Sequence, residues 1–298
     1  MFNELLSEGG LSLDRLKNFC AVAEAGGIAR VAGGDPAKQS LYSRQLRELE
    51  QFFGVELTRR KGKGIEFTEQ GLELARHVRA HLQSLTDFKK ACAGQPIEFR
   101  IASGNSVVEW LLVPNLGRLT AEAPSTRFSF QNMRTADIVR GLKEHSMDFG
   151  ILRKSAVVAP LKFQSIGQVG YALFAPAAWA KEKENATTLL SQRPVAVPAG
   201  GEFNERFQEC CEKAKLTPNL RFSCASFTQV AELVRAGHAV ALLPEMAEPN
   251  LRASGVKRFD FAPMRIYRRE IGIVWHPRLV SIRPQADLVL AGLKRIEA

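Results

Sequence analysis

The sequence predicts an α/β fold in its C-terminal two thirds, preceded by an all-α winged helix-turn-helix and one long helix. Three observations support this fold class. Apolar residues recur at helical spacing as far as about residue 92, Gly-Gly pairs separate short helices near the N-terminus, and strand-like and helix-like segments alternate from residue 97 onward. A chain of 298 residues with 45% hydrophobic content can form two or three compact units.

Turn and capping residues divide the N-terminal segment into three short helices. Ser12 is a favourable N-cap for the first helix, which Gly26-Gly27 ends. A short second helix stops at Gly33-Gly34, and Asp35-Pro36 supplies the N-cap and the first-turn proline of a third helix that ends near residue 53. A glycine-containing turn between the second and third helices is typical of a helix-turn-helix.

Polar and basic residues gather on the third helix and on the segment that follows it. Alternating apolar residues flank a glycine-rich basic turn at 59–64, which predicts a β-hairpin, or wing, whose cations can contact phosphates or enter the minor groove of DNA. Arginine can pair with guanine and glutamine with adenine in the major groove. The candidate DNA-binding residues are Lys38, Gln39, Ser40, Ser43, Arg44, Arg47, Arg60, Lys61 and Lys63.

The same segment resembles the LysR-type family of transcriptional regulators. The matching residues keep one register without a gap: Leu16, Phe19, Val22, Ala23, Glu24, Gly26, then Gln39, Ser43, Arg44, Gln45, Leu46, Leu49, Glu50, then Gly54, Leu57, Arg60, Gly62, Thr68 and Gly71. Departures concentrate around the turn, where Gly33-Gly34-Asp35-Pro36 and Lys38 replace the family pattern. The resemblance implies a regulator that binds double-stranded DNA, with RNA polymerase as a further partner.

A long helix is expected over residues 69–93, after a DNA-binding domain at 1–68. Thr68 can cap this helix, and an apolar stripe runs along it with no obvious cover in its own domain. The resemblance implies that the helix pairs two subunits, in a dimer or a tetramer built from two dimers. The alternative is a helix that packs on its own chain. The candidate dimerisation residues are Leu74, Val78, Leu82 and Leu85.

The remainder, residues 96–298, alternates strands with helices and is expected to be α/β. The segment Leu233–Pro244 and the Gly141 to Ile151 region resemble the effector domain of the LysR-type family, which has two lobes and is related to periplasmic binding proteins. On this basis, lobe I is expected at 97–165 and 266–298 and lobe II at 166–265.

Three strand-to-helix turns, at 103–106, 200–203 and 226–228, are expected to converge where the lobes meet, because ligands of open α/β sheets bind beyond the carboxyl ends of the strands. Helix N-termini there favour an anion, which predicts a small carboxylate-bearing effector, and Glu202 favours a polar or zwitterionic one. The turn hydroxyls can instead merely cap their helices. The candidate effector-binding residues are Ser103, Asn105, Ser106, Arg153, Gly201, Phe203, Phe227 and Thr228.

Charge and cysteine content constrain the function without fixing it. The net charge is +10, yet residues 1–92 carry 14 Lys and Arg against 12 Asp and Glu, so local clusters must provide the DNA-binding surface.

No apolar run is long enough for a membrane span and no signal segment is recognisable, which predicts a cytoplasmic protein with no membrane partner. Five cysteines without a metal-ligand spacing are expected to be free thiols, although Cys210, Cys211 and Cys224 could form a redox group.

No motif for catalysis, metal or a cofactor is present, so we expect neither an enzyme nor a bound cofactor. His238 and His276 are expected to be structural or surface residues. Two other functions compete with the regulator: a solute-binding protein, which the C-terminal part alone would permit, and a cytosolic α/β enzyme with an N-terminal interaction module.

Overall fold

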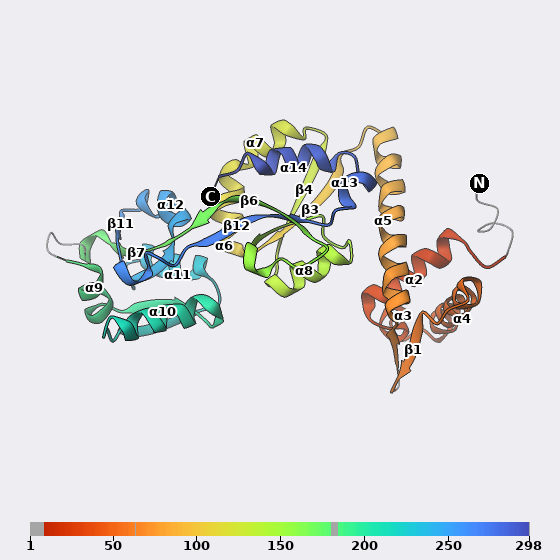
Figure 1. The fold of residues 1–298 in the computed structure, drawn as a ribbon, viewed down its shortest axis with the longest axis horizontal. Coiled ribbons are helices and arrows are strands. Elements are labelled where there is room, and N and C mark those ends of the chain that lie inside the picture. The colour runs from red at the N-terminus through yellow and green to blue at the C-terminus, as the bar shows by residue number, and fades with distance from the viewer. Residues whose placement is uncertain (1–8, 63, 180–183, 298) are drawn as a thin grey trace.

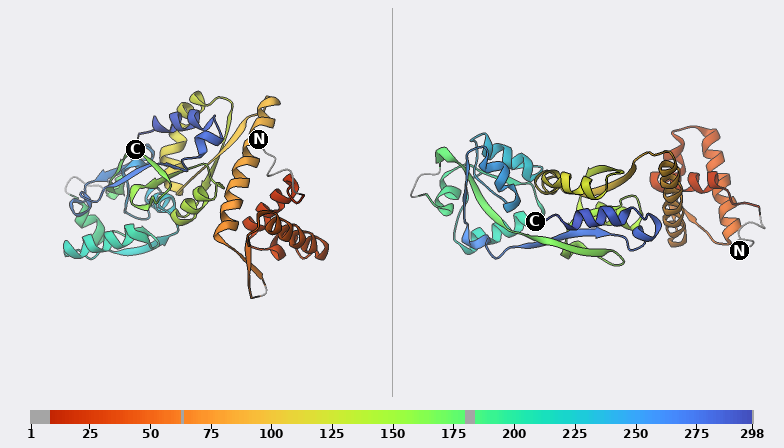
Figure 2. Two further views of the ribbon diagram at one scale, coloured as in Figure 1. Left: turned by 45° about the vertical axis from the view of Figure 1, so that its right-hand side comes forward. Right: turned by 90° about the horizontal axis from the view of Figure 1, so that it is seen from above.

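The computed structural model describes residues 9–62, 64–179 and 184–297. The chain has three parts in series: a small helical domain with a β-hairpin, the long helix α5, and a domain of two lobes (Figure 1). A view from above shows the same row of parts, with α5 between the helical domain and the nearer lobe (Figure 2). The predicted α/β class with an N-terminal winged helix-turn-helix is confirmed.

Local sequence signals set the bounds of the N-terminal helices. The Ser12 side chain accepts the N–H of Arg15, and the Asp35 side chain accepts those of Ala37 and Lys38. Glycine takes the left-handed conformation at the end of each helix, which it adopts without a steric penalty. The elements are α2 (Leu13–Ala25), α3 (Ile28–Ala32), α4 (Pro36–Phe53), β1 (Thr58–Lys61) and β2 (Gly64–Phe67).

The helix α5 (Glu69–Cys92) begins in the core of this domain and extends beyond it. Thr68 caps the helix by accepting the N–H of Gly71. A Cβ at Gly71 would come within 2.0 Å of the Leu57 carbonyl oxygen, so only glycine allows the helix to lie this close to the start of the wing. Ala75 joins Phe19, Leu46, Leu49 and Leu57 in the domain core, which fixes the direction of α5.

Lobe I is built on a five-stranded sheet with the order β4-β3-β5-β12-β6. Strand β3 is parallel to β4 and β5, and β12 is antiparallel to β5 and β6. The strands are β3 (Ile97–Ser103), β4 (Thr126–Asn132), β5 (Phe149–Arg153), β6 (Lys162–Val169) and β12 (Arg269–Trp275). The helices are α6 (Asn105–Val107), η1 (Val108–Leu112), η2 (Val113–Asn115), α7 (Leu116–Glu122), α8 (Thr135–Lys143), η3 (Lys154–Ala156), α13 (Leu279–Ile282) and α14 (Ala286–Lys294).

Lobe II contains a three-stranded sheet, β10-β7-β11, and a parallel pair, β8-β9, which an isolated bridge between Val195 and Val240 links to the segment before β10. The strands are β7 (Tyr171–Pro176), β8 (Val195–Pro198), β9 (Leu220–Cys224), β10 (Ala241–Pro244) and β11 (Val256–Phe259). The helices are η4 (Ala177–Trp179), α9 (Ala186–Gln192), α10 (Gly201–Lys213), α11 (Phe227–Arg235), η5 (Glu245–Ala247), α12 (Glu248–Arg252) and η6 (Ala262–Met264).

The structure moves the boundary between the lobes. The expected break at 165/166 falls inside β6, which stays paired with β12 as far as Val169 opposite Arg269. This antiparallel pair, whose register shifts between Ile271 and Gly272, carries the backbone hydrogen bonds of the lobe I sheet up to the crossing. The chain therefore changes lobe at about Gly170 and again just before Arg269.

Candidate DNA-binding surface and effector site

The outer face of α4 carries the residues expected to contact DNA. Lys38, Ser40, Arg44 and Arg47 are exposed, whereas Gln39 and Ser43 are half-buried. Within the described chain, the carboxylate nearest to Arg44 is that of Glu48, with 3.8 Å between the Nε and Oε1 atoms. Glu48 is also held by Arg15 at 2.8 Å, so Arg44 keeps most of its charge and hydrogen-bonding capacity free.

The wing is exposed on both strands, and its cations differ in how freely they can bind phosphate. Lys61 pairs with Glu66 at 2.6 Å, whereas Arg60 has no ion-pair partner in the part of the chain that the structure describes. Arg60 is therefore the better placed of the two to meet a phosphate. Lys63, the third expected wing contact, lies outside the described residues.

The apolar stripe of α5 divides into two parts. Leu74 is half-buried and packs on the core of the N-terminal domain, Val78 is buried, and Leu82 is half-buried. Leu85 is 54% exposed, and Phe88, one turn further on, is 70% exposed. The first half of the stripe is therefore covered by the chain itself, and only the second half is free to meet a partner.

The opposite side of α5 is fastened to lobe I by a buried ionic cluster. Arg283 donates to Asp87 on α5 at 2.6 Å and to Asp148 before β5 at 2.6 Å, and it also donates to the Glu98 carbonyl. Its guanidinium lies 4.0 Å from the centre of the Phe99 ring. Burial raises the pKa of the Asp148 carboxyl, and the Arg283 charge opposes that shift. The cluster fixes α5 on the lobe.

The three turns expected to converge do meet at the junction of the lobes. Asn105 of lobe I donates to the Thr228 hydroxyl at 2.9 Å, and Thr228 also contacts the Ser226 hydroxyl at 2.8 Å. The Phe203 and Phe227 rings, at the starts of α10 and α11, are in edge-to-face contact at 4.9 Å. Side chains from all three turns therefore lie close together at the junction of the lobes.

Charged groups bridge the same junction. Arg153 of lobe I pairs with Glu202 of lobe II, and Arg269 lies 3.8 Å from the same carboxylate. The Arg269 Nε donates to the Tyr267 hydroxyl at 2.7 Å, and its guanidinium lies 5.0 Å from the Tyr267 ring centre. Two guanidinium groups thus share one carboxylate, which leaves positive charge uncompensated there.

The remaining predicted effector residues are less available to a ligand or less informative. Ser103 is fully buried and its hydroxyl donates to the Ile151 carbonyl at 2.9 Å, so that hydroxyl already has a structural acceptor. Ser106 is half-buried one residue beyond Asn105, and Gly201 is exposed in a left-handed conformation beside Glu202.

The sequence analysis did not identify three residues of the junction: Tyr171, Tyr267 and Arg269. Tyr171 stacks with Tyr267 at 5.5 Å and lies 4.7 Å from the Phe203 ring, measured between ring centres. All three residues are located where the chain crosses between lobes. A sequence analysis that placed the ends of β6 and β12 correctly would have put these three residues at the junction.

Burial disfavours the thiolate form of several cysteines. It raises the pKa of Cys20 to about 11 and that of Cys211 to about 11, and it also raises the pKa values of Cys210 and Cys224. Cys92 is exposed at the end of α5. Because the thiolate is the reactive form, the buried thiols are poor nucleophiles at neutral pH.

In the described residues, no helix is long and apolar enough to cross a membrane, and no group of His, Cys, Asp or Glu side chains is arranged to hold a metal ion.

Comparisons with known proteins place both domains. Residues 13–72 match the model of the bacterial regulatory helix-turn-helix protein, lysR family, and residues 94–291 match the LysR substrate binding domain. A probable hydrogen peroxide-inducible genes activator of Mycobacterium avium is 27% identical, over 93% of this chain and 91% of the relative. Other curated relatives are also described as transcriptional regulators.

Full-length regulators of this type share the fold. LysG from Corynebacterium glutamicum, solved with bound effector Arg, superposes with a TM-score of 0.63 at 17% identity, over 96% of this chain and 99% of the other. CbnR, solved in complex with its target DNA, gives a TM-score of 0.58 at 21% identity, over 96% and 99%. The chain therefore belongs to the LysR-type family and is a ligand-responsive, DNA-binding transcription regulator.

Proposed function

We propose that this regulator acts in the cytoplasm as a dimer or a tetramer, binds DNA through α4 and the wing, and responds to a small carboxylate-bearing effector at the junction of the lobes. The observation that carries the effector assignment is the sharing of Glu202 by Arg153 and Arg269 across the junction. Contact with RNA polymerase is part of the same proposal.

The charge balance at the junction supports a carboxylate ligand. The Nε atom of Arg153 is buried and has no hydrogen-bond partner among the described residues. An unpaired buried donor is costly, and a bound carboxylate would supply an acceptor for it. Glu202 would then be released from one guanidinium and could accept a ligand ammonium group, which favours a zwitterion over a dicarboxylate.

A thermal-shift screen of the full chain tests the effector. We expect amino acids and monocarboxylates to raise the melting temperature, because a ligand that binds only the folded state stabilises it. Arg153→Gln should remove that increase, and Lys257→Gln, which changes an exposed lysine of β11, should preserve it. Stabilisation by neutral sugars alone would exclude a carboxylate effector while leaving DNA binding untouched.

Arg44→Ala is expected to weaken specific DNA binding by roughly 1–3 kcal/mol, because an arginine on the recognition helix can make a bidentate contact with guanine. A gel-shift titration against DNA fragments selected by the purified protein measures the loss. Arg127→Ala, which removes an arginine from the exposed edge strand β4, is the matched control. An unchanged affinity for Arg44→Ala would show that α4 does not present this residue to the bases.

A further inference from the structure

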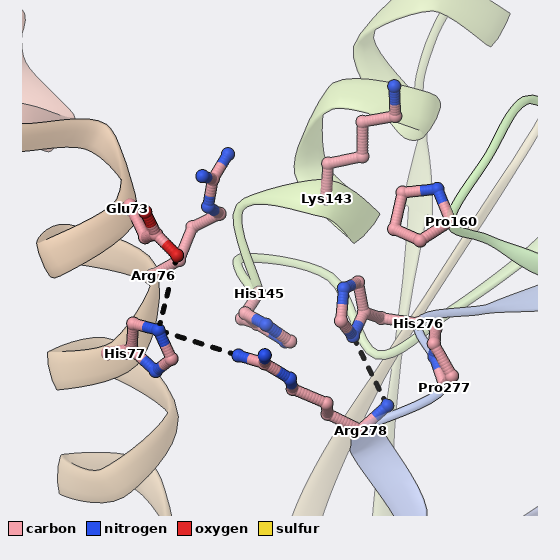
Figure 3. Close-up of a pocket in the computed structure, with 9 residues that line it drawn as sticks. All are labelled: Glu73, Arg76, His77, Lys143, His145, Pro160, His276, Pro277 and Arg278. Carbon is pink, nitrogen blue, oxygen red and sulfur yellow. Dashed lines mark hydrogen bonds and ion pairs between the residues drawn. The ribbon is translucent and has the colours of Figure 1, made fainter. Parts of the chain in front are cut away.

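A cavity lies between α5 and lobe I (Figure 3). Its volume is about 350 Å³, which falls at the lower end of the range for small-molecule sites, about 300–1,000 Å³. The walls come from the middle of α5, from the end of α8 and from the segment after β12. The side chains that can bear positive charge are Arg76, His77, Lys143, His145, His276 and Arg278.

Positive charge in this cavity is poorly compensated. Glu73 is the one carboxylate in the lining, and its Oε1 is 3.7 Å from the His77 Nε2. Neither Arg76 nor Lys143 has an ion-pair partner anywhere in residues 9–62, 64–179 and 184–297. Arg278 has no carboxylate partner among the described residues, and its NH1 group lies 3.5 Å from the His77 Nε2.

The positive charge around this cavity, together with burial, lowers the pKa values of two of its imidazole groups. His145 and His276 are in edge-to-face contact, with 4.4 Å between ring centres. Burial, followed by the charges of His276, Arg79, Arg278 and Arg76, lowers the pKa of His145 to about 4. Burial, Arg278 and Arg76 also lower the pKa of His276. The lowered pKa values favour the neutral form of both rings.

In its neutral form, the His276 ring has one N–H group that can donate a hydrogen bond. The backbone N–H of Arg278 donates to its Nδ1 at 3.2 Å, which assigns the ring proton to Nε2. His276 was expected to be a lone histidine with a structural or surface role, and the structure places it in a group of three histidines (Figure 3). The His145 backbone is left-handed, with a φ of 56°, a conformation in which glycine is the usual residue.

We propose that this cavity binds a phosphate dianion, as inorganic phosphate or as a small phosphomonoester, between Arg76 of α5 and Arg278 of lobe I. Guanidinium groups match the geometry of phosphate oxygens, and Lys143 and the imidazole N–H groups add further donors. Because Arg76 and Arg278 belong to different parts of the chain, a bound dianion would add a further link between α5 and lobe I to those of the Arg283 cluster and of Arg79, which donates to the Glu144 carbonyl.

The cavity is separate from the DNA-binding surface. Arg76 and His77 lie on a different face of α5 from Leu74 and Ala75, which pack in the core of the N-terminal domain, as the helical period of 3.6 residues requires. A DNA phosphate bound by α4 or the wing therefore cannot occupy this site. The ligand must be a free anion.

Isothermal titration calorimetry of the full chain in phosphate-free buffer tests the proposal. Inorganic phosphate and glycerol 3-phosphate are the probes, and the tighter binder identifies the source of the phosphate group. We expect saturable binding that Arg76→Gln and Arg278→Gln each weaken by about tenfold or more, since each removes a charge-assisted contact. Arg76→Lys keeps the positive charge but loses the paired N–H donors of the guanidinium group, so it should weaken phosphate binding less than Arg76→Gln does.

Two controls make the result specific. Arg153→Gln should leave phosphate binding unchanged, because it removes an arginine at the junction of the lobes. Lys257→Gln, which removes an exposed positive charge elsewhere on the surface, should also leave phosphate binding unchanged. Absence of saturable heat, wild-type affinity for phosphate in both cavity variants, or tighter binding of succinate than of phosphate would each overturn the proposal. A loss of phosphate binding in Arg153→Gln would place the anion at the junction instead.

Discussion

Arg283→Met is expected to lower the free energy of unfolding by about 3–5 kcal/mol, because it leaves the buried carboxylates of Asp87 and Asp148 without their shared cation. Denaturant unfolding of the full chain, followed by circular dichroism, measures the loss. The control is Arg127→Met, the same chemical change at an exposed pair, which should cost about 0–1 kcal/mol. Equal losses in the two variants would mean that the buried cluster contributes no more to the free energy of unfolding than an exposed ion pair does.

The loss in Arg283→Met should depend on pH in a defined direction. Burial already raises the pKa of Asp148, and removal of the opposing arginine raises it further in the folded state. The folded variant then binds more protons than the unfolded chain, so its stability falls as pH rises. The deficit should therefore be smaller at about pH 5 than at about pH 7. Adding Asp87→Asn, which removes one buried charge, should recover part of the stability at the higher pH.

Leu85→Asp combined with Phe88→Asp is expected to dissociate the dimer and to weaken operator binding by about 100-fold or more, because linking two half-site contacts multiplies affinity by about 10²–10⁴. Both side chains are largely exposed in one protomer, so the substitutions should not disturb its fold. Analytical ultracentrifugation measures assembly, and gel-shift titration measures binding.

The matched control for that variant is Leu288→Asp, at a leucine of α14 that is 49% exposed. It should keep the wild-type sedimentation and affinity. A doubly substituted protein that sediments as wild type would contradict pairing through the end of α5. Substitutions at Val78 are unsuitable for this test, because that side chain is buried within the protomer and an aspartate there would disturb the fold directly.

The features predicted well from the sequence are those that neighbouring residues determine. Ser12, Asp35 and Thr68 all cap the helices that follow them, because capping needs only an N–H group two or three residues away. The segment between β3 and the end of α7 is less regular. It contains a π-helical turn at η1 and a 3-10 turn at η2, where Pro114 has no N–H to donate.

Contacts between distant segments could not be predicted in this way. Arg283 and Asp87 are 196 positions apart, and no local pattern marks them as partners. The apolar stripe of α5 shows the same limit, because periodicity identifies an apolar face but not what covers it. The N-terminal domain covers the stripe at Leu74, whereas Leu85 lies beyond the reach of that domain. The convergence of the turns after β8 and β9 was predictable because these parallel strands end at a common edge, whereas the turn after β3 belongs to the sheet of the other lobe.

The double attachment of α5 has a mechanical consequence. The helix is a rod of 24 residues, about 36 Å long at 1.5 Å per residue, with one end built into the DNA-binding domain and the other fixed near Asp87. A tilt of about 5° at the fixed end displaces the opposite end by about 3 Å, close to the 3.4 Å spacing of successive base pairs. A small movement of the lobe would therefore displace the DNA-binding domain by a distance comparable to one base-pair step, and in a dimer such movements would alter the separation of the two recognition helices.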